Sequence, residues 1–175
     1  MLLQKNFLLI SCLFWAGSSL QGAPVYADMT LDSFFEKYEG TIWQGSSDLW
    51  VDPSGNTGAS SVAELSVEDG KITYLWSLNK DKHFGTILQD PSGIRWQDSF
   101  HTKEQALLTF SENVNGIFAA TYMYSEPENP GWFWRIKMSQ RPDKRLVVQM
   151  TNITPWGEEA RAVRLILQLK AAPEN

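Results

Sequence analysis

Cysteine, histidine and positive charge are scarce in this chain of 175 residues. The single cysteine is Cys12, which lies in the apolar leading segment, so residues 28–175 contain no thiol. Disulfide bonds, cysteine metal sites and cysteine nucleophiles are therefore excluded from that part of the chain. Fifteen Lys and Arg against twenty Asp and Glu give a formal net charge of −5. This balance excludes a nucleic-acid binder that works through bulk positive charge.

Apolar runs long enough for a transmembrane helix, which needs about 20 apolar residues, are also missing. The longest run, residues 7–16, follows the positive charge of Lys5 and precedes small and polar residues. This order is typical of a secretory signal peptide, and Ala27 offers a small residue at a cleavage site. We expect residues 1–27 to be a signal peptide and residues 28–175 to be one domain, periplasmic or secreted, with no stable membrane span after cleavage. A retained membrane anchor is the alternative.

One helical segment precedes a series of short β runs. Thr30 is suited to cap a helix over residues 31–38, whose apolar side chains recur on one face before Gly40. Beyond it, short runs rich in β-branched and aromatic residues alternate with turns of Gly, Pro, Asn and Asp. We expect strands over residues 41–51, 58–67, 71–78, 83–89, 94–100, 105–111, 117–125, 132–140, 145–153 and 159–169.

The alternation within these runs predicts how the sheet is arranged. Residues 132–140, for example, place Trp132, Trp134 and Ile136 on one face and polar residues on the other. No crossover helix separates the runs, which favours antiparallel neighbours, and closure removes the exposed edges. We therefore predict an all-β fold, a closed antiparallel up-and-down barrel of about ten strands with a short N-terminal helix. A β-sandwich would produce the same alternation and is the alternative.

Aromatic residues on the inward faces are the candidate ligand site. They could simply fill the core, but ligand cavities are also mostly apolar and aromatic with a few polar groups. Asp98 falls on an apolar face, where it is either satisfied by protein donors or orients a polar group of a ligand. The predicted ligand-binding residues are Trp76, Trp96, Asp98, Tyr122 and Trp134.

Two short stretches resemble a known family. The helix followed by residues 40–45, Gly-Thr-Ile-Trp-Gln-Gly, is similar to the opening of lipocalin-like (calycin) barrels, with one more residue between Gly and Trp. Residues 152–159, NITPWGEE, and the Arg-containing apolar strand after them resemble the closing hairpin of small bacterial calycin-type families of uncharacterised function. The resemblance spans about residues 30–169 in layout. It implies a barrel whose cavity holds a small apolar molecule, with a Trp and a late-strand Arg at its base.

Arg161 and Trp43 are the residues that fit this closure of the barrel. Alternation places Arg161 on an apolar face, and a cation–π contact with Trp43 would close the base. Arg164 would take its place if the register differed by one residue, because such a shift exchanges the two faces of a strand.

The two histidines do not indicate chemistry. His83 alternates with the apolar Phe84, and His101 shares the polar face of Arg95, so both are expected to point outward. Haem and transition-metal sites are therefore not expected, and no Gly-x-Ser-x-Gly nucleophile motif occurs. We expect no catalytic residues, no metal site and no cofactor. The large apolar side chains expected outside the barrel or at turns are Trp50, Phe133 and Trp156.

The sequence thus predicts an exported binding protein that holds a small hydrophobic ligand in its barrel interior and carries out no reaction. A packed barrel that serves as a protein-interaction or structural module is the alternative, and a calycin-fold enzyme is the third. The volume of the interior separates the first two, since a cavity of about 300 Å³ or more is the size of a ligand pocket.

Export predicts a processed N-terminus. Because Ala27 precedes the expected cleavage point, the mature chain should begin at Asp28 or within a few residues of it. Intact mass measurement of the protein from its native host gives the answer. A cytosolic chain that retains Met1 would contradict the prediction.

Overall fold

The helix expected at residues 31–38 is present in the computed structural model. Helix α1 (Leu31–Tyr38) is capped by Thr30, whose hydroxyl accepts a hydrogen bond from the backbone N–H of Ser33 at 3.2 Å. It ends where Gly40 takes a positive φ of 73°, a conformation that glycine adopts without strain. The structure describes residues 29–50, 57–78, 80–102, 104–110, 116–124 and 130–171; the expected signal peptide and turns such as 52–56 lie outside them.

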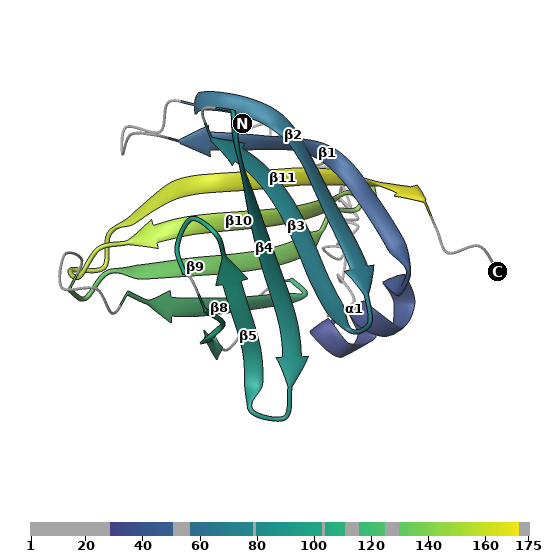
Figure 1. Ribbon diagram of the computed structural model, residues 1–175, viewed down its shortest axis with the longest axis horizontal. Helices are drawn as coiled ribbons and strands as arrows, with labels where there is room; N and C mark the ends of the chain where they lie inside the picture. The colour runs from purple at the N-terminus through teal and green to yellow at the C-terminus, as the bar shows by residue number, and fades with distance from the viewer. Residues whose placement is uncertain are drawn as a thin grey trace, which may run out of the picture.

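The rest of the described chain is one antiparallel sheet (Figure 1), and its strands follow the ten expected ranges closely. The first five strands are β1 (Thr41–Trp50), β2 (Thr57–Glu68), β3 (Lys71–Leu78), β4 (Asp81–Asp90) and β5 (Gly93–Asp98). Two short strands follow, β6 (Ala106–Leu107) and β7 (Thr109–Phe110). The last four are β8 (Phe118–Met123), β9 (Phe133–Gln140), β10 (Leu146–Ile153) and β11 (Glu159–Ala171).

The order of the strands closes the sheet into a nearly complete barrel. It runs β6-β5-β4-β3-β2-β1-β11-β10-β9-β8-β7. The pair β1 and β11 is the one pair of neighbouring described strands that is not consecutive in the sequence. The two ends of the order, β6 and β7, are consecutive in the chain and are separated by Leu108 alone. One half of the expected strand 105–111 therefore pairs with β5 and the other half with β8. In Figure 1 the two halves of the sheet cross and face each other. The predicted up-and-down barrel is confirmed.

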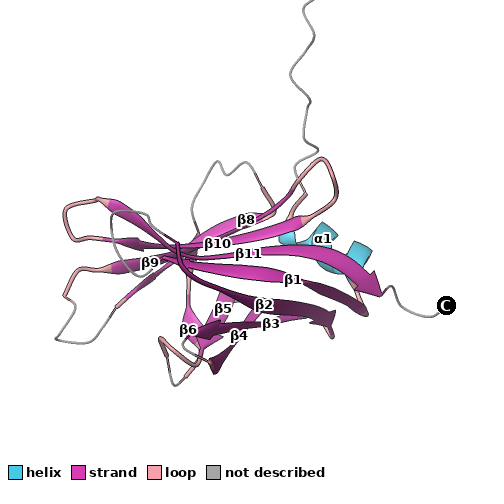
Figure 2. Ribbon diagram, turned by 90° about the horizontal axis from the view of Figure 1, so that it is seen from above, coloured by secondary structure: helices cyan, strands magenta, loops and turns pink. Residues whose placement is uncertain are grey.

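The base of the barrel is packed solid against the helix. Figure 2 shows α1 beside the end where β1 begins and β11 ends. Phe34 is fully buried there, and the ring of Tyr38 meets the indole of Trp43 edge-on, with centroids 5.1 Å apart. The Tyr38 hydroxyl also hydrogen bonds to Gln140 at the end of β9. The helix therefore packs across this end of the barrel.

Close contact across β3 and β4 requires a glycine at position 85. Gly85 faces Tyr74 across the strand pair, and a Cβ added to it would lie 1.9 Å from the Tyr74 ring. The ring therefore fills the space that a side chain on β4 would otherwise take.

We expect Gly85→Ala to destabilise the protein by about 1–3 kcal/mol, because overpacking displaces a buried ring. Thr86→Ala, next to it on the same strand and half-buried, is the control and should change stability far less. Chemical denaturation followed by circular dichroism measures both. Equal stability of the two variants would contradict the close packing of Tyr74 on Gly85.

Candidate functional site

A cavity of about 590 Å³ opens at the end of the barrel opposite to the helix. Its walls come from five strands, β1, β3, β9, β10 and β11, from Tyr124 just after β8, and from the turn that follows β5. Most of the lining is aromatic: Trp50, Trp76, Phe100, His101, Tyr124, Trp132 and Trp134. The other lining residues are Leu49, Leu78, Asn152, Ala162 and Val163. We call this cavity the mouth pocket.

Behind the pocket wall, a buried carboxyl group holds several aromatic side chains in place. Asp98, at the end of β5, is fully buried. Its Oδ2 accepts hydrogen bonds from the Tyr74 hydroxyl at 2.9 Å and from the Trp76 indole N–H at 3.1 Å. Its Oδ1 accepts one from the backbone N–H of Phe100 at 2.9 Å. Trp96 completes the network, since its indole N–H donates to the Tyr74 hydroxyl at 2.8 Å. The protein itself thus satisfies this carboxyl group.

Tyr74 keeps its proton in this network. Burial raises the pKa of the Tyr74 phenol well above 10.0, because water cannot solvate the phenolate there. The charge on Asp98, which is hydrogen bonded to the same hydroxyl, raises the pKa further. The neutral phenol can then both donate to Asp98 and accept from Trp96.

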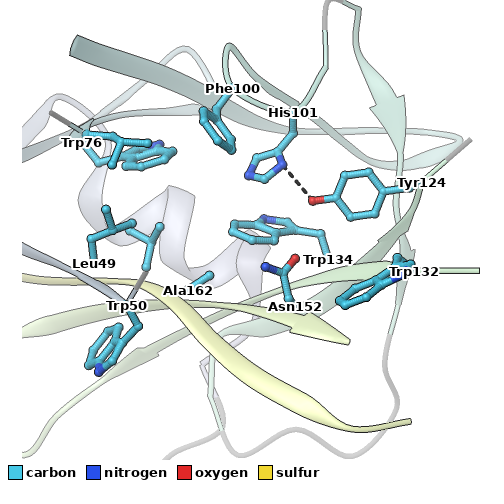
Figure 3. Close-up of a pocket in the computed structure, with 12 residues that line it drawn as sticks. Leu49, Trp50, Trp76, Phe100, His101, Tyr124, Trp132, Trp134, Asn152 and Ala162 are labelled. Atoms are coloured by element: carbon cyan, nitrogen blue, oxygen red, sulfur yellow. Dashed lines mark hydrogen bonds between the residues drawn. The ribbon is translucent and has the colours of Figure 1, made fainter. Parts of the chain in front are cut away.

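Asp98 also shapes the turn that brings His101 into the pocket. Strand β5 ends at Asp98, and its backbone carbonyl accepts hydrogen bonds from the N–H groups of His101 and Thr102. The helical turn reverses the direction in which the side chains point, so the expectation that His101 lies on the outer polar face is wrong. His101 Nδ1 instead shares a 2.8 Å hydrogen bond with the Tyr124 hydroxyl (Figure 3).

Trp134 lies at the centre of the pocket wall, between the His101 ring and the Asn152 amide (Figure 3). The His101 and Trp134 ring centroids are 4.0 Å apart, and Asn152 is the cross-strand partner of Trp134 on β10. Trp134 is only 2% exposed. Its buried indole nitrogen nonetheless has no hydrogen-bond partner within the described residues. The indole N–H of Trp134 is therefore a donor in the pocket wall without an acceptor among the described residues.

His83 also faces inward, contrary to expectation. The register pairs Trp76 with His83 and Tyr74 with Gly85, so these positions on β4 share the inner face. The His83 ring lies 4.6 Å from the Trp76 ring, whereas Phe84 is 55% exposed. Because Phe84 is apolar, the sequence suggested that Phe84 faces inward and His83 outward. In the structure Gly85 faces inward, where the Tyr74 ring fills the space of its missing side chain, and His83 shares that face.

The expected contact of Arg161 with Trp43 is not formed. A β-bulge on β11 pairs Val163 with Met150 but Arg161 with Thr151, so the alternation shifts by one residue and Arg161 becomes exposed. Trp43 pairs with Leu169 at the far end of β11, roughly 25 Å from Arg161 at the rise of a strand.

Arg161 and Arg164 instead lie over the Trp50 ring, with guanidinium carbons 5.9 and 4.9 Å from its centroid. Arg164 also pairs with Asp48 through a 2.8 Å ion pair. Trp50, expected at the outer surface or in a turn, is only 7% exposed beneath these cations, whereas Trp156 is 69% exposed as expected. Trp43 does lie at the base of the barrel, where the arginine that lines the same cavity is Arg145 and not Arg161.

The structure separates the five predicted ligand-binding residues into two groups. Trp76 and Trp134 line the mouth pocket. Trp96 and Asp98 lie behind the wall as parts of the hydrogen-bond network, and neither is exposed. Tyr122 packs against Trp96, with ring centroids 5.4 Å apart, and it is the cross-strand partner of Trp134.

Several pocket residues were not anticipated. His101 and Phe100 depend on the turn after β5, and Ala162 depends on the bulge in β11. No periodicity in the sequence indicates such irregularities. Asn152 was the exception, because it alternates with the inward Met150 on β10 and could have been placed by parity.

A second cavity, of about 650 Å³, lies at the helix end between α1 and the β9–β10 hairpin. Two of its charged side chains, Arg145 and Lys37, have partners, since Arg145 pairs with Asp143 and Lys37 lies over the Tyr38 ring. Charged side chains line this second cavity and none of the described ones lines the mouth pocket, so the mouth pocket is the better candidate for an apolar ligand. Among the described residues, no cluster of His, Asp and Glu suits a metal ion, and no helix is long and apolar enough to cross a membrane.

Comparison of the chain with protein-family models, with curated proteins and with solved structures returned no match.

The network around Asp98 predicts a stability that falls in alkali. Tyr74→Phe leaves the Trp96 N–H without its acceptor and should cost about 1–3 kcal/mol at neutral pH. Because folding raises the pKa of Tyr74, its contribution is present below pH 10.0 and is lost as the pH rises above that value toward the raised pKa.

The wild type should therefore lose stability above pH 10.0 more steeply than Tyr74→Phe, as measured by urea denaturation over a pH series. Tyr38→Phe removes a hydroxyl at the helix end and should keep the steep wild-type slope. Identical slopes for wild type and Tyr74→Phe would show that this phenol does not stay protonated in the fold.

Proposed function

We propose that this protein is an exported binding protein whose mouth pocket holds a small, largely apolar molecule. The single observation that carries the proposal is the contrast between the two ends of the barrel. The cavity at the base lies among charged side chains such as Asp143 and Arg145, whereas the mouth keeps a cavity of about 590 Å³ with a mostly aromatic lining. Ligand pockets for small molecules typically have volumes of about 300–1,000 Å³.

The chemistry of the lining supports an apolar ligand. The described lining residues are aromatic or aliphatic apart from Asn152, and no Asp, Glu, Lys or Arg is among them. Burying a charge without a partner costs much free energy, so a strongly charged molecule would fit poorly. Flat indole and imidazole surfaces suit stacking and hydrophobic contact.

The hydrogen bonds behind the pocket wall hold its side chains in place, as expected of a binding pocket and not of a loosely packed core. A binding pocket gains affinity when its groups are held in place before the ligand arrives. The Asp98 network fixes Trp76 and the turn that carries His101, and Tyr124 holds the His101 ring from the other side. The walls therefore do not need to be ordered by the ligand.

Exposed aromatic groups surround the entrance, which also fits uptake of an apolar molecule. Trp156, at the tip of the β10–β11 hairpin, is 69% exposed and meets Trp132 edge-on at 6.2 Å. Phe100, on the turn after β5, is 52% exposed and lines the pocket. These side chains would be the first contacts of a ligand that enters from outside.

Filling the mouth pocket should abolish binding. Nile red, a neutral fluorescent probe, should bind the wild type with a rise in fluorescence. Ala162→Phe places a ring in the cavity and should weaken binding at least about tenfold, the equivalent of about 1.4 kcal/mol. Val62→Phe adds the same ring on the outer face of β2, where the residue is 71% exposed, and should bind like the wild type.

Two results would count against the proposal: a wild type that does not bind Nile red, or equal binding by Ala162→Phe that is folded by circular dichroism. Native mass spectrometry of the protein from its own host extends the test, since a small molecule that copurifies would identify the ligand directly.

A further inference from the structure

The unused donor of Trp134 is the most informative group in the mouth pocket. A buried N–H without an acceptor loses its hydrogen bonds to water and receives nothing in return. In this fold the cross-strand neighbours of Trp134 are Asn152 and Tyr122, and both carry oxygen atoms. Neither accepts a hydrogen bond from the indole nitrogen. An arrangement that leaves this donor open next to two possible acceptors points to an acceptor supplied from outside.

The surroundings of the donor restrict what can supply that acceptor. The rings of Trp134 and His101 are inclined to each other by 42° with centroids 4.0 Å apart, and Trp76 and Trp132 also line the cavity. Aromatic walls of this kind favour a flat molecule that can stack. Because the described lining has no Asp, Glu, Lys or Arg, an ionised group of the ligand would have no counter-charge.

We infer that the ligand is a neutral, planar aromatic compound with a carbonyl-type oxygen, which accepts a hydrogen bond from the indole N–H of Trp134. This inference rests on the proposed function and adds the ligand class to it. The Asn152 amide, on the other face of the indole, is placed to serve a second polar atom of the ligand. Hydrocarbons without an acceptor would leave the Trp134 donor unsatisfied and bind more weakly.

Two probes of the same shape separate the hydrogen bond from the hydrophobic contact. 2-Acetylnaphthalene carries a carbonyl oxygen where 2-isopropenylnaphthalene carries a methylene group, and both are neutral and flat. One hydrogen bond in a buried site changes affinity by roughly five- to tenfold. The ketone should therefore displace Nile red from the wild type at a concentration roughly five to ten times lower than the alkene.

The matched variants are Trp134→Phe and Trp132→Phe, which each remove one indole N–H from the pocket lining. In Trp134→Phe the ratio of the two affinities should fall to about one, whereas Trp132→Phe should keep the wild-type ratio. The ratio is the readout because a smaller ring changes both affinities together. Should Trp134→Phe fail to fold, the wild type gives the answer in a ¹H–¹⁵N spectrum. The ketone, but not the alkene, should shift the Trp134 indole N–H signal downfield.

Each outcome has a distinct meaning. Equal affinities of ketone and alkene for the wild type, or an unchanged indole signal, would overturn the inference while binding of Nile red still supports the proposed function. Failure of both naphthalenes to displace bound Nile red would likewise overturn the inference alone. If Nile red itself does not bind, the inference falls with the proposed function.

Discussion

The barrel mouth depends on the hydrogen bonds that Asp98 accepts. A carboxyl group in the centre of an apolar barrel is tolerated only when donors surround it, and here Tyr74, Trp76 and the backbone of Phe100 provide three. Each donor belongs either to a residue that lines the pocket or to a residue packed behind the pocket wall. The same group therefore positions an indole in the wall, orders the turn after β5 and ties strands β3 and β5 together inside the barrel.

Side chains occupy the barrel interior differently at its two ends. At the base, helix α1 brings Phe34 and Tyr38 onto Trp43 and fills the space between the strands. At the mouth, the aromatic side chains are held against the walls by the polar network and leave the centre open. A barrel with this many strands is wide enough for this division, because its interior exceeds what one layer of side chains fills.

The proposed function rests on the mouth pocket, and the proposed ligand class rests on the few polar atoms that line it. Apolar area provides affinity for many molecules, whereas specificity comes from a small number of placed polar groups. In this pocket those groups are the Trp134 N–H, the Asn152 amide and the hydrogen-bonded pair of His101 and Tyr124.

The sequence by itself determined the helix, the strand ranges, the antiparallel barrel and the inward position of Asp98. Capping, turn residues and alternation act over a few neighbouring residues, so they can be recognised without the partner strands. Tertiary structure decided the faces of His83, His101 and Arg161. Their positions depend on a register set by Gly85 under a ring of another strand, on a turn anchored by Asp98, and on a bulge opposite Met150 and Thr151. Each of these is a relation between strands, and one residue of shift exchanges the inside of the barrel for the outside.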